Sequence, residues 1–200
     1  MKTLIITQRY EKIGKHHELR DNLDVRFIKL IEKIGFKPVL MPNEVLNPKK
    51  FITNIKPSAI VLSPGGDPKK KDLRNKNEYE LIKFSLKTKT PLIGICRGAQ
   101  VLNLYFGGRL KKIKNHVRKS NVISGKIVNK KKISVKCFHN LGINKKLLGK
   151  NLEILAKSFD ESIECFTHKK KKLTGIMWHP ERYRNFRNFD INLLKKKLSK

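Results

Sequence analysis

Short apolar runs and stretches with helical spacing alternate along the first half of the chain. The apolar runs predict buried strands at residues 4–6, 39–41, 59–62 and 92–95. Apolar residues three and four positions apart predict helices from Leu23 to Ile34, ended by Gly35, over about Glu78 to Leu86, and through Val101, Leu102, Tyr105 and Phe106. A loop is expected before the first helix and a linking segment after the second strand. Because strands alternate with helices, the sheet is expected to be parallel.

After Gly107 and Gly108 the pattern changes to short alternating stretches, which are typical of antiparallel strands. Residues 122–128 and 133–137, joined by a lysine-rich turn, predict a hairpin. Further strands are predicted at 152–156, 163–167 and 173–177, before a last amphipathic helix with Phe189, Leu193, Leu194 and Leu198 on its inner face. Without a repeat or a domain linker, residues 1–200 are interpreted as one compact α/β domain with a mixed sheet.

Length and cysteine content narrow the class of protein. A chain of 200 residues can bury about 70% of the surface that it exposes when unfolded. It contains no run of about 18 apolar residues, so neither a membrane span nor a signal peptide is expected. Cys96, Cys137 and Cys165 are odd in number and have no framework spacing, which favours a reducing compartment. We therefore expect a cytoplasmic protein.

The net charge of +31 would fit a nucleic-acid binder, but its distribution argues against that partner. The excess is mostly lysine, whereas base recognition relies on the arginine fork. The lysine runs are spread over predicted turns and the final helix, at residues 69–71, 130–132, 169–172 and 195–197. Compositional enrichment in lysine explains this pattern, and a polyanionic partner or an anionic substrate stays open as the alternative.

Cys96 is the strongest candidate for chemistry. Gly94 and Gly98 lie two residues to either side, which is the spacing of a nucleophile elbow between a buried strand and a helix. The start of the helix is expected to lower the pKa of the thiol, because unpaired N–H groups favour the anion. An inert buried cysteine is the competing interpretation.

His179 is the candidate general base, at the end of the last predicted strand. Glu181 follows two residues later, on the same side of an extended segment, and Pro180 restricts the backbone between them. A carboxylate in that place can orient the imidazole. Cys96, His179 and Glu181 therefore predict a catalytic triad.

Backbone N–H groups are the candidates for binding an oxyanion. Gly65 and Gly66 follow a buried strand without side chains that would block their amides, and Arg97 offers the N–H next to the nucleophile. Gly66, Cys96 and His179 all follow the carboxyl ends of predicted strands, where open parallel sheets bind ligands. His139, also at a strand end, is placed near the site, with an ordinary strand-end histidine as the alternative.

A metal site is not expected, because the chain has neither a Cys-x-x-Cys pair nor His-Glu-x-x-His spacing. No cofactor is expected either.

Together these motifs resemble the class I glutamine amidotransferase superfamily over nearly the whole chain. Ile-Thr-Gln-Arg, Gly-Ile-Cys-Arg-Gly-Ala-Gln, Asn-His, Phe-His and Met-Trp-His-Pro-Glu-Arg are similar to the stand-alone γ-glutamyl hydrolases, and most similar to the short γ-glutamyl-CDP-amidate hydrolases of capsule phosphoramidate synthesis. His17-Glu18-x-Arg20 and Arg74-x-x-x-Glu78 also match that branch, whereas Asn75 stands where it more often has aspartate.

The resemblance implies a flavodoxin-like three-layer sandwich and a thioester mechanism. Cys96 would attack a γ-glutamyl carbonyl, His179 would protonate the leaving nitrogen, and Glu181 would orient His179. The Gly66 and Arg97 N–H groups would hold the oxyanion. The residues implied in binding the glutamyl group are Gly65, Gln100, Phe138 and His139.

Three functions remain open from the sequence. The first is a hydrolase that frees an amine or phosphoramidate from a small γ-glutamyl substrate, which the positive charge would steer if it were anionic. The second is a glutaminase subunit that passes ammonia to a separate synthetase. The third is a noncatalytic module that binds polyanions.

Overall fold

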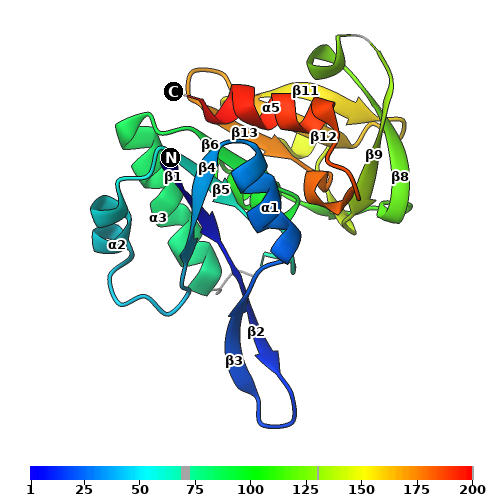
Figure 1. Ribbon diagram of the computed structural model, residues 1–200. Coiled ribbons are helices and arrows are strands. Elements are labelled where there is room, and N and C mark those ends of the chain that lie inside the picture. Colours follow the sequence, from blue (N-terminus) through cyan, green and yellow to red (C-terminus); the bar gives the residue numbers. More distant parts are fainter. Residues whose placement is uncertain (69–72, 130, 200) are drawn as a thin grey trace.

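The computed structural model describes residues 1–68, 73–129 and 131–199 (Figure 1). Its centre is a nine-stranded sheet in the order β4-β1-β5-β6-β13-β12-β11-β8-β9. The parallel strands are β4 (Phe36–Met41), β1 (Lys2–Thr7), β5 (Ala59–Leu62), β6 (Leu92–Ile95) and β13 (Leu173–Ile176). The antiparallel strands are β12 (Ile163–His168), β11 (Leu152–Ser158), β8 (Val117–Ser124) and β9 (Ile133–Phe138). The mixed sheet expected from the alternation pattern is confirmed.

Helices cover both faces of the parallel strands and make the three layers (Figure 1). One face packs against α1 (Val25–Lys33) and α5 (Asn188–Leu198). The other packs against α2 (Pro48–Ile55), α3 (Leu73–Thr88) and α4 (Arg97–Tyr105). Alternate residues of β1 belong to the two cores. Leu4 and Ile6 lie in the core with α1, whereas Ile5 lies in the opposite core. The predicted flavodoxin-like sandwich is therefore confirmed.

Two backbone hydrogen bonds connect the antiparallel strands β9 and β12 to the segment that follows β13. The backbone N–H of His179, just after β13, donates to the carbonyl of Lys136 on β9 at 3.0 Å. Likewise the N–H of Met177 donates to the carbonyl of Glu164 on β12 at 2.8 Å. Side chains from β9 and β12 are thereby brought next to the carboxyl ends of the parallel strands.

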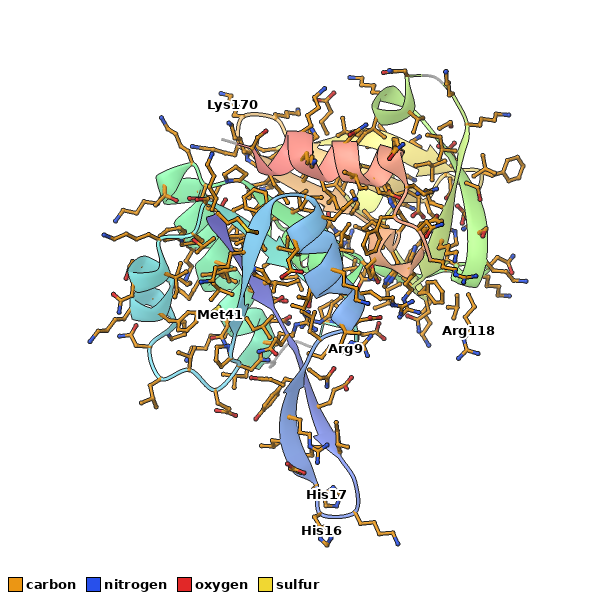
Figure 2. All side chains as sticks on the ribbon, viewed as in Figure 1. Arg9, His16, His17, Met41, Arg118 and Lys170 are labelled. Atoms are coloured by element: carbon orange, nitrogen blue, oxygen red, sulfur yellow. The ribbon has the colours of Figure 1, made fainter. Side chains whose placement is uncertain are left out.

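A hairpin replaces the loop expected before the first helix. β2 (Arg9–Ile13) pairs with β3 (Glu18–Asn22) and projects from the body of the protein, with His16 and His17 at its tip (Figures 1 and 2). Its strands carry charged residues on both faces and are largely exposed, so they lack the apolar alternation that identifies a strand. Asn43 anchors the base of the hairpin, because its N–H and side-chain amide donate to Asp21 at 2.9 and 2.6 Å.

Three other boundaries differ from the predictions. α2 lies in the expected linking segment, and its signal was local: Asn47 caps the N–H of Lys50 at 2.9 Å, ahead of Pro48 in the first turn. α3 begins five residues before the predicted Glu78. The predicted strand 122–128 is displaced, because β8 ends at Ser124 and residues 126–128 form a 3₁₀ turn. Gly125 breaks the strand with φ 140°, where an added Cβ would lie 2.4 Å from the Leu155 carbonyl oxygen.

Two further short strands, β7 (Lys111–Lys112) and β10 (Leu141–Gly142), pair with each other outside the main sheet. The lysine runs at 169–172 and 195–197 occupy an exposed turn and α5, as predicted. Residues 69–71 and 130 of the other two runs lie outside the described residues. Within the described ranges no helix is both long and apolar enough to span a membrane.

Candidate active site

Cys96 lies at a sharp turn between β6 and α4, as the glycine spacing predicted. Its backbone has φ 50° and ψ −103°, a conformation that residues other than glycine rarely adopt. The flanking glycines are required by close contacts: a Cβ on Gly94 would lie 2.4 Å from the Gly98 carbonyl oxygen, and one on Gly98 would lie 2.1 Å from that of Leu62. This packing holds the strained turn against β5.

His179, which lines one cavity with the candidate nucleophile, forms a buried pair with Glu181. Glu181 lies in a 3₁₀ turn, residues 180–182, and not in the extended segment that was predicted. The Nδ1 atom of His179 is 2.6 Å from Oε1 of Glu181, and both residues are at most 2% exposed. Because an ionised carboxylate only accepts hydrogen bonds, Nδ1 carries the proton and Nε2 keeps a free lone pair. In the described part of the chain, Nε2 has no hydrogen-bond partner. Its ring shares one cavity with Cys96, so the imidazole is arranged to accept a proton there.

The pKa of Cys96 moves in the direction opposite to the prediction. Burial raises the pKa of the thiol to about 12, and the negative charge of Glu181 adds to the rise. The Arg97 backbone N–H bonds to the sulfur and lowers the pKa, but by less. Burial of the sulfur therefore raises the pKa of Cys96 by more than the start of the helix lowers it. In the resting protein the thiol is protonated near neutral pH, and a base must take its proton before it can attack.

The raised pKa predicts how alkylation of Cys96 depends on pH. A thiol far below its pKa gains thiolate about tenfold per pH unit. We expect the rate of iodoacetamide modification of Cys96, followed by mass spectrometry of its peptide, to keep rising from about pH 7 to about pH 10. The Cys165 peptide is the internal reference, because that thiol is buried and its pKa is also raised. A plateau in the Cys96 rate below about pH 8 would contradict the prediction.

The Gly65–Gly66 turn directs a backbone N–H toward the same cavity. Nη1 of Arg74 donates to the Gly65 carbonyl oxygen at 2.9 Å, and Nη2 donates to the Ser63 carbonyl oxygen at 2.6 Å. Because a trans peptide points its C=O and N–H in opposite directions, the Gly66 N–H is directed away from Arg74. Gly66 and Cys96 line one cavity, so this N–H and that of Arg97 are the donors available to an oxyanion.

A buried ionic network supports both donors, and it escaped the sequence analysis. Glu78 on α3 is fully buried; its Oε1 accepts from Nε of Arg74 at 2.9 Å, and its Oε2 pairs with the guanidinium of Arg97. Arg97 also donates to Oδ1 of Asn75 at 2.6 Å, the position where aspartate is more common in the resembling branch. Thr7 on β1 completes the contact to Glu78 at 3.0 Å. The Arg74-x-x-x-Glu78 spacing was the available signal, since residues i and i+4 share a helix face.

Most of the predicted binding residues meet in a cavity of about 190 Å³. Its lining includes Cys96, His179, Gly65, Gly66, Gln100, Phe138 and His139. Gln100 donates to the Leu141 carbonyl oxygen at 3.0 Å, which leaves its buried Oε1 without a partner in the described residues. Phe138 packs edge-on against the His179 ring at 5.3 Å. The two nitrogens of His139 face Leu141 and Glu164, so this residue presents its ring to the cavity.

Four residues of the lining were not predicted: Arg9, Asp67, Asn140 and Arg182. Arg182 stacks on Phe138 with its guanidinium 4.0 Å from the ring centre. Arg9 lies at the base of the β2–β3 hairpin (Figure 2), and its guanidinium fills the space that a side chain at Gly65 would occupy. Arg9 begins β2, Arg182 lies in a 3₁₀ turn, and the other two follow β5 and β9, so no local pattern links the four residues.

Comparison with known proteins agrees with this geometry. The family model for class-I glutamine amidotransferases matches residues 19–199. The chain belongs to this family. It is thus an enzyme of the class that acts on amide carbon–nitrogen bonds, as the motifs predicted.

Its similarity to individual amidotransferases extends over most of the chain. A gamma-glutamyl-CDP-amidate hydrolase from Campylobacter jejuni is 36% identical over an alignment of 199 positions, which covers 93% of each chain. The carbamoyl phosphate synthase small chain of Aquifex aeolicus is 33% identical, over 74% of this chain and 38% of that protein. The crystal structure of a glutamine amidotransferase from Thermotoga maritima gives a TM-score of 0.67 at 17% identity, over 99% of this chain and 84% of that one, and so shares the fold.

Proposed function

We propose that this class I amidotransferase hydrolyses a γ-glutamyl amide through a thioester on Cys96. The observation that carries the proposal is the position of Cys96: a strained elbow places it in a cavity that His179 also lines, and Nε2 of His179 has no hydrogen-bond partner among the described residues. The similarity to a gamma-glutamyl-CDP-amidate hydrolase over 93% of both chains supports the same reaction class.

The chemistry begins with a neutral pair, because the thiol of Cys96 is protonated at rest. Nε2 of His179 takes the proton as sulfur attacks the γ-carbonyl, and the carboxylate of Glu181 stabilises the imidazolium that forms. The N–H groups of Gly66 and Arg97 bind the developing oxyanion. His179 then returns the proton to the leaving nitrogen. Water attacks the thioester with His179 as its base, which releases glutamate and regenerates the thiol.

A second and larger cavity offers space for the leaving group. It has a volume of about 950 Å³ and shares Arg9, Gly65, Gly66 and Asp67 with the smaller cavity. The glutamyl part of a substrate would occupy the small cavity and its amine part the large one, with the scissile bond near Cys96. The lining of the large cavity carries both charges, because Glu11, Glu44 and Asp67 lie there beside Arg9 and Lys12, and Arg9 is 3.6 Å from Glu11. We propose that Arg9, at the junction, contacts a phosphate-bearing amine, because its guanidinium matches that group with paired N–H donors.

Exchange of Arg9 for glutamine tests the choice of leaving group. For a γ-glutamyl conjugate that carries a phosphate, we expect Arg9→Gln to lower kcat/KM about tenfold or more, the range for one charge-assisted hydrogen bond. With glutamine as substrate, kcat/KM should change far less, because ammonia makes no such contact. Glutamate release is the measurement for both substrates.

Lys12→Gln is the matched control for charge, since it removes one cation from the exposed part of the same cavity. We expect it to leave both substrates nearly unaffected. If Arg9→Gln lowers kcat/KM equally with both substrates, Arg9 maintains the structure of the site and does not contact the leaving group.

The alternative is a glutaminase subunit that supplies ammonia to a separate synthetase. It is favoured by the similarity to the carbamoyl phosphate synthase small chain, whose name describes one chain of a synthase. Glutamate release by the isolated chain separates the two functions. Strong activity on glutamine that requires a partner protein would overturn the hydrolase proposal.

A further inference from the structure

Four buried residues with metal-binding side chains form a second cluster that the proposed mechanism does not use. They are His116 immediately before β8, Cys137 on β9, His139 after β9 and Glu164 on β12. One ligand atom from each lies within 4.8 Å of all the others. None of the four residues is more than 4% exposed. We call them the interior ligand cluster.

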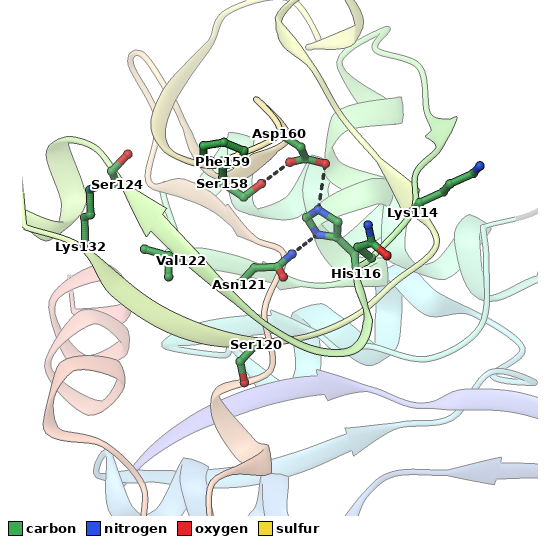
Figure 3. A pocket seen from close by; sticks show the side chains of 11 residues that line it. Lys114, His116, Ser120, Asn121, Val122, Ser124, Lys132, Ser158, Phe159 and Asp160 are labelled. Atoms are coloured by element: carbon green, nitrogen blue, oxygen red, sulfur yellow. Dashed lines mark hydrogen bonds and ion pairs between the residues drawn. The ribbon is translucent and has the colours of Figure 1, made fainter.

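Outer contacts fix the orientation and tautomer of His116 (Figure 3). Nε2 lies 3.0 Å from Oδ2 of Asp160, and Nδ1 lies 2.9 Å from the side-chain amide nitrogen of Asn121. A carboxylate accepts and an amide nitrogen donates, so Nε2 carries the proton and the lone pair of Nδ1 accepts from Asn121. Nδ1 also lies 3.2 Å from Oε1 of Glu164, inside the cluster, so a cation there would take this lone pair in place of the Asn121 contact.

His139 is arranged in the same way by a backbone group. Its Nδ1 lies 3.1 Å from the Leu141 carbonyl oxygen, which can only accept, so Nδ1 carries the proton. Nε2 then faces Oε1 of Glu164 at 3.6 Å with its lone pair. Neither atom of this pair has a hydrogen-bond partner among the residues that the structure describes. Histidine ligands of metals have this arrangement, with the outer N–H held by a carboxylate or a carbonyl.

Nε2 of His139 and Oε1 of Glu164 therefore direct acceptors at each other in the protein interior, an arrangement that a cation between them would stabilise. From this geometry we propose that the interior ligand cluster binds Zn²⁺. Two imidazoles, a thiolate and a carboxylate suit this ion, which binds them at about 2.0–2.3 Å with tetrahedral geometry. Such bonds separate neighbouring ligand atoms by about 3.3–3.8 Å. Two contacts to Oε1 of Glu164, at 3.2 Å from His116 and 3.6 Å from His139, are already near these values, and ligand atoms that lie up to 4.8 Å apart would move closer on binding.

A route for the ion and a role for the site follow from the surroundings. A cavity of about 530 Å³ borders the cluster at His116, Asn121 and Asp160 (Figure 3). With four protein ligands the ion has no open position, which is typical of a structural zinc. Cys137 and His139 flank Phe138, the residue that packs against His179. The ion would therefore fix one wall of the candidate active site, and because its ligands come from distant strands, sequence spacing did not reveal it.

Metal analysis of the purified protein tests the proposal without reference to turnover. After treatment with a chelator, we expect equilibrium dialysis against Zn²⁺ to restore one equivalent, measured by mass spectrometry of the metal. Co²⁺ in place of Zn²⁺ should give the intense visible bands of a tetrahedral site and a thiolate-to-cobalt band in the near ultraviolet. A wild-type chain that retains no equivalent of either ion would overturn the proposal.

Single substitutions assign the ion to its ligands. Cys137→Ser should abolish the thiolate-to-cobalt band and weaken Zn²⁺ binding at least tenfold. Cys165→Ser is its matched control, a buried cysteine outside the cluster, and should keep both. Asp160→Asn changes the outer partner of His116, together with an acceptor for Ser158 and Ser162, and should weaken Zn²⁺ binding about 10- to 100-fold. It also serves if Cys137→Ser does not fold, because Asp160 is 44% exposed.

Two further controls exclude other sites for the ion. His16→Ala with His17→Ala removes the exposed histidines at the hairpin tip, and Cys96→Ser removes the thiol of the candidate active site. Both should keep one equivalent of Zn²⁺ and the thiolate band. Loss of the band in Cys96→Ser, or unchanged binding in both Cys137→Ser and Asp160→Asn, would overturn the proposal.

Discussion

Cys96→Ala is expected to lower the hydrolysis of γ-glutamyl amides by about 10⁴-fold or more. Without the sulfur no thioester forms, and the remaining donors and base stabilise only a slow direct attack by water. The fold should persist, because alanine also has a Cβ and occupies the same strained backbone at φ 50°. Glutamate release measures the loss, and the urea midpoint of unfolding verifies that the variant is folded.

Cys165→Ala provides the matched control, since it removes an equally buried sulfur that does not line the candidate site. We expect it to retain turnover. Undiminished hydrolysis in Cys96→Ala would rule out the thioester mechanism. If the wild-type chain instead binds nucleic acid with a steep salt dependence and cleaves no γ-glutamyl substrate, the noncatalytic polyanion-binding function is favoured.

Glu78→Gln is expected to have the largest effect on stability. The carboxylate is fully buried and contacts two guanidinium groups, those of Arg74 and Arg97, which are 3% and 2% exposed. Removing one member of a buried ion pair costs about 3–5 kcal/mol, because its partners were desolvated to meet that charge. The free energy of unfolding in urea should fall by about this amount.

The same substitution should also reduce turnover in molecules that remain folded. Arg74 fixes the Gly65 peptide, and Arg97 follows the nucleophile, so loosening either displaces an oxyanion donor. Glu80→Gln is the control on the same helix, because Glu80 pairs with exposed Lys83 at the surface. We expect no measurable change in its unfolding. A Glu78→Gln chain as stable as wild type would contradict a structural role for the network.

The sequence was informative wherever a local pattern is tied directly to backbone geometry. Gly94 and Gly98 predicted the elbow, since any Cβ at either position collides with backbone. The spacing of His179 and Glu181 predicted that the two side chains meet, but not how: they were expected in an extended segment, whereas residues 180–182 form a 3₁₀ turn that brings Glu181 to His179. The apolar runs likewise predicted the parallel strands, which, apart from the edge strand β4, are buried on both faces.

The hairpin β2–β3 shows where such patterns fail. Its strands are exposed on both faces, and their pairing depends on the turn and on Asn43, a residue from a different loop. The end of β8 is a related case. Gly125 stops the strand because β11 approaches its backbone, and that contact joins segments 30 residues apart in the chain.

What the sequence alone determined is the alternating α/β architecture and the identity of the candidate nucleophile, base and orienting acid. Only the tertiary structure decided the direction of the Cys96 pKa, the support of the site by Glu78 and the assembly of the interior ligand cluster. The physical reason is the range of the interactions. Backbone conformation and burial periodicity are local and repeat along the chain, whereas desolvation and contacts between distant strands arise only when the sheet brings those strands together.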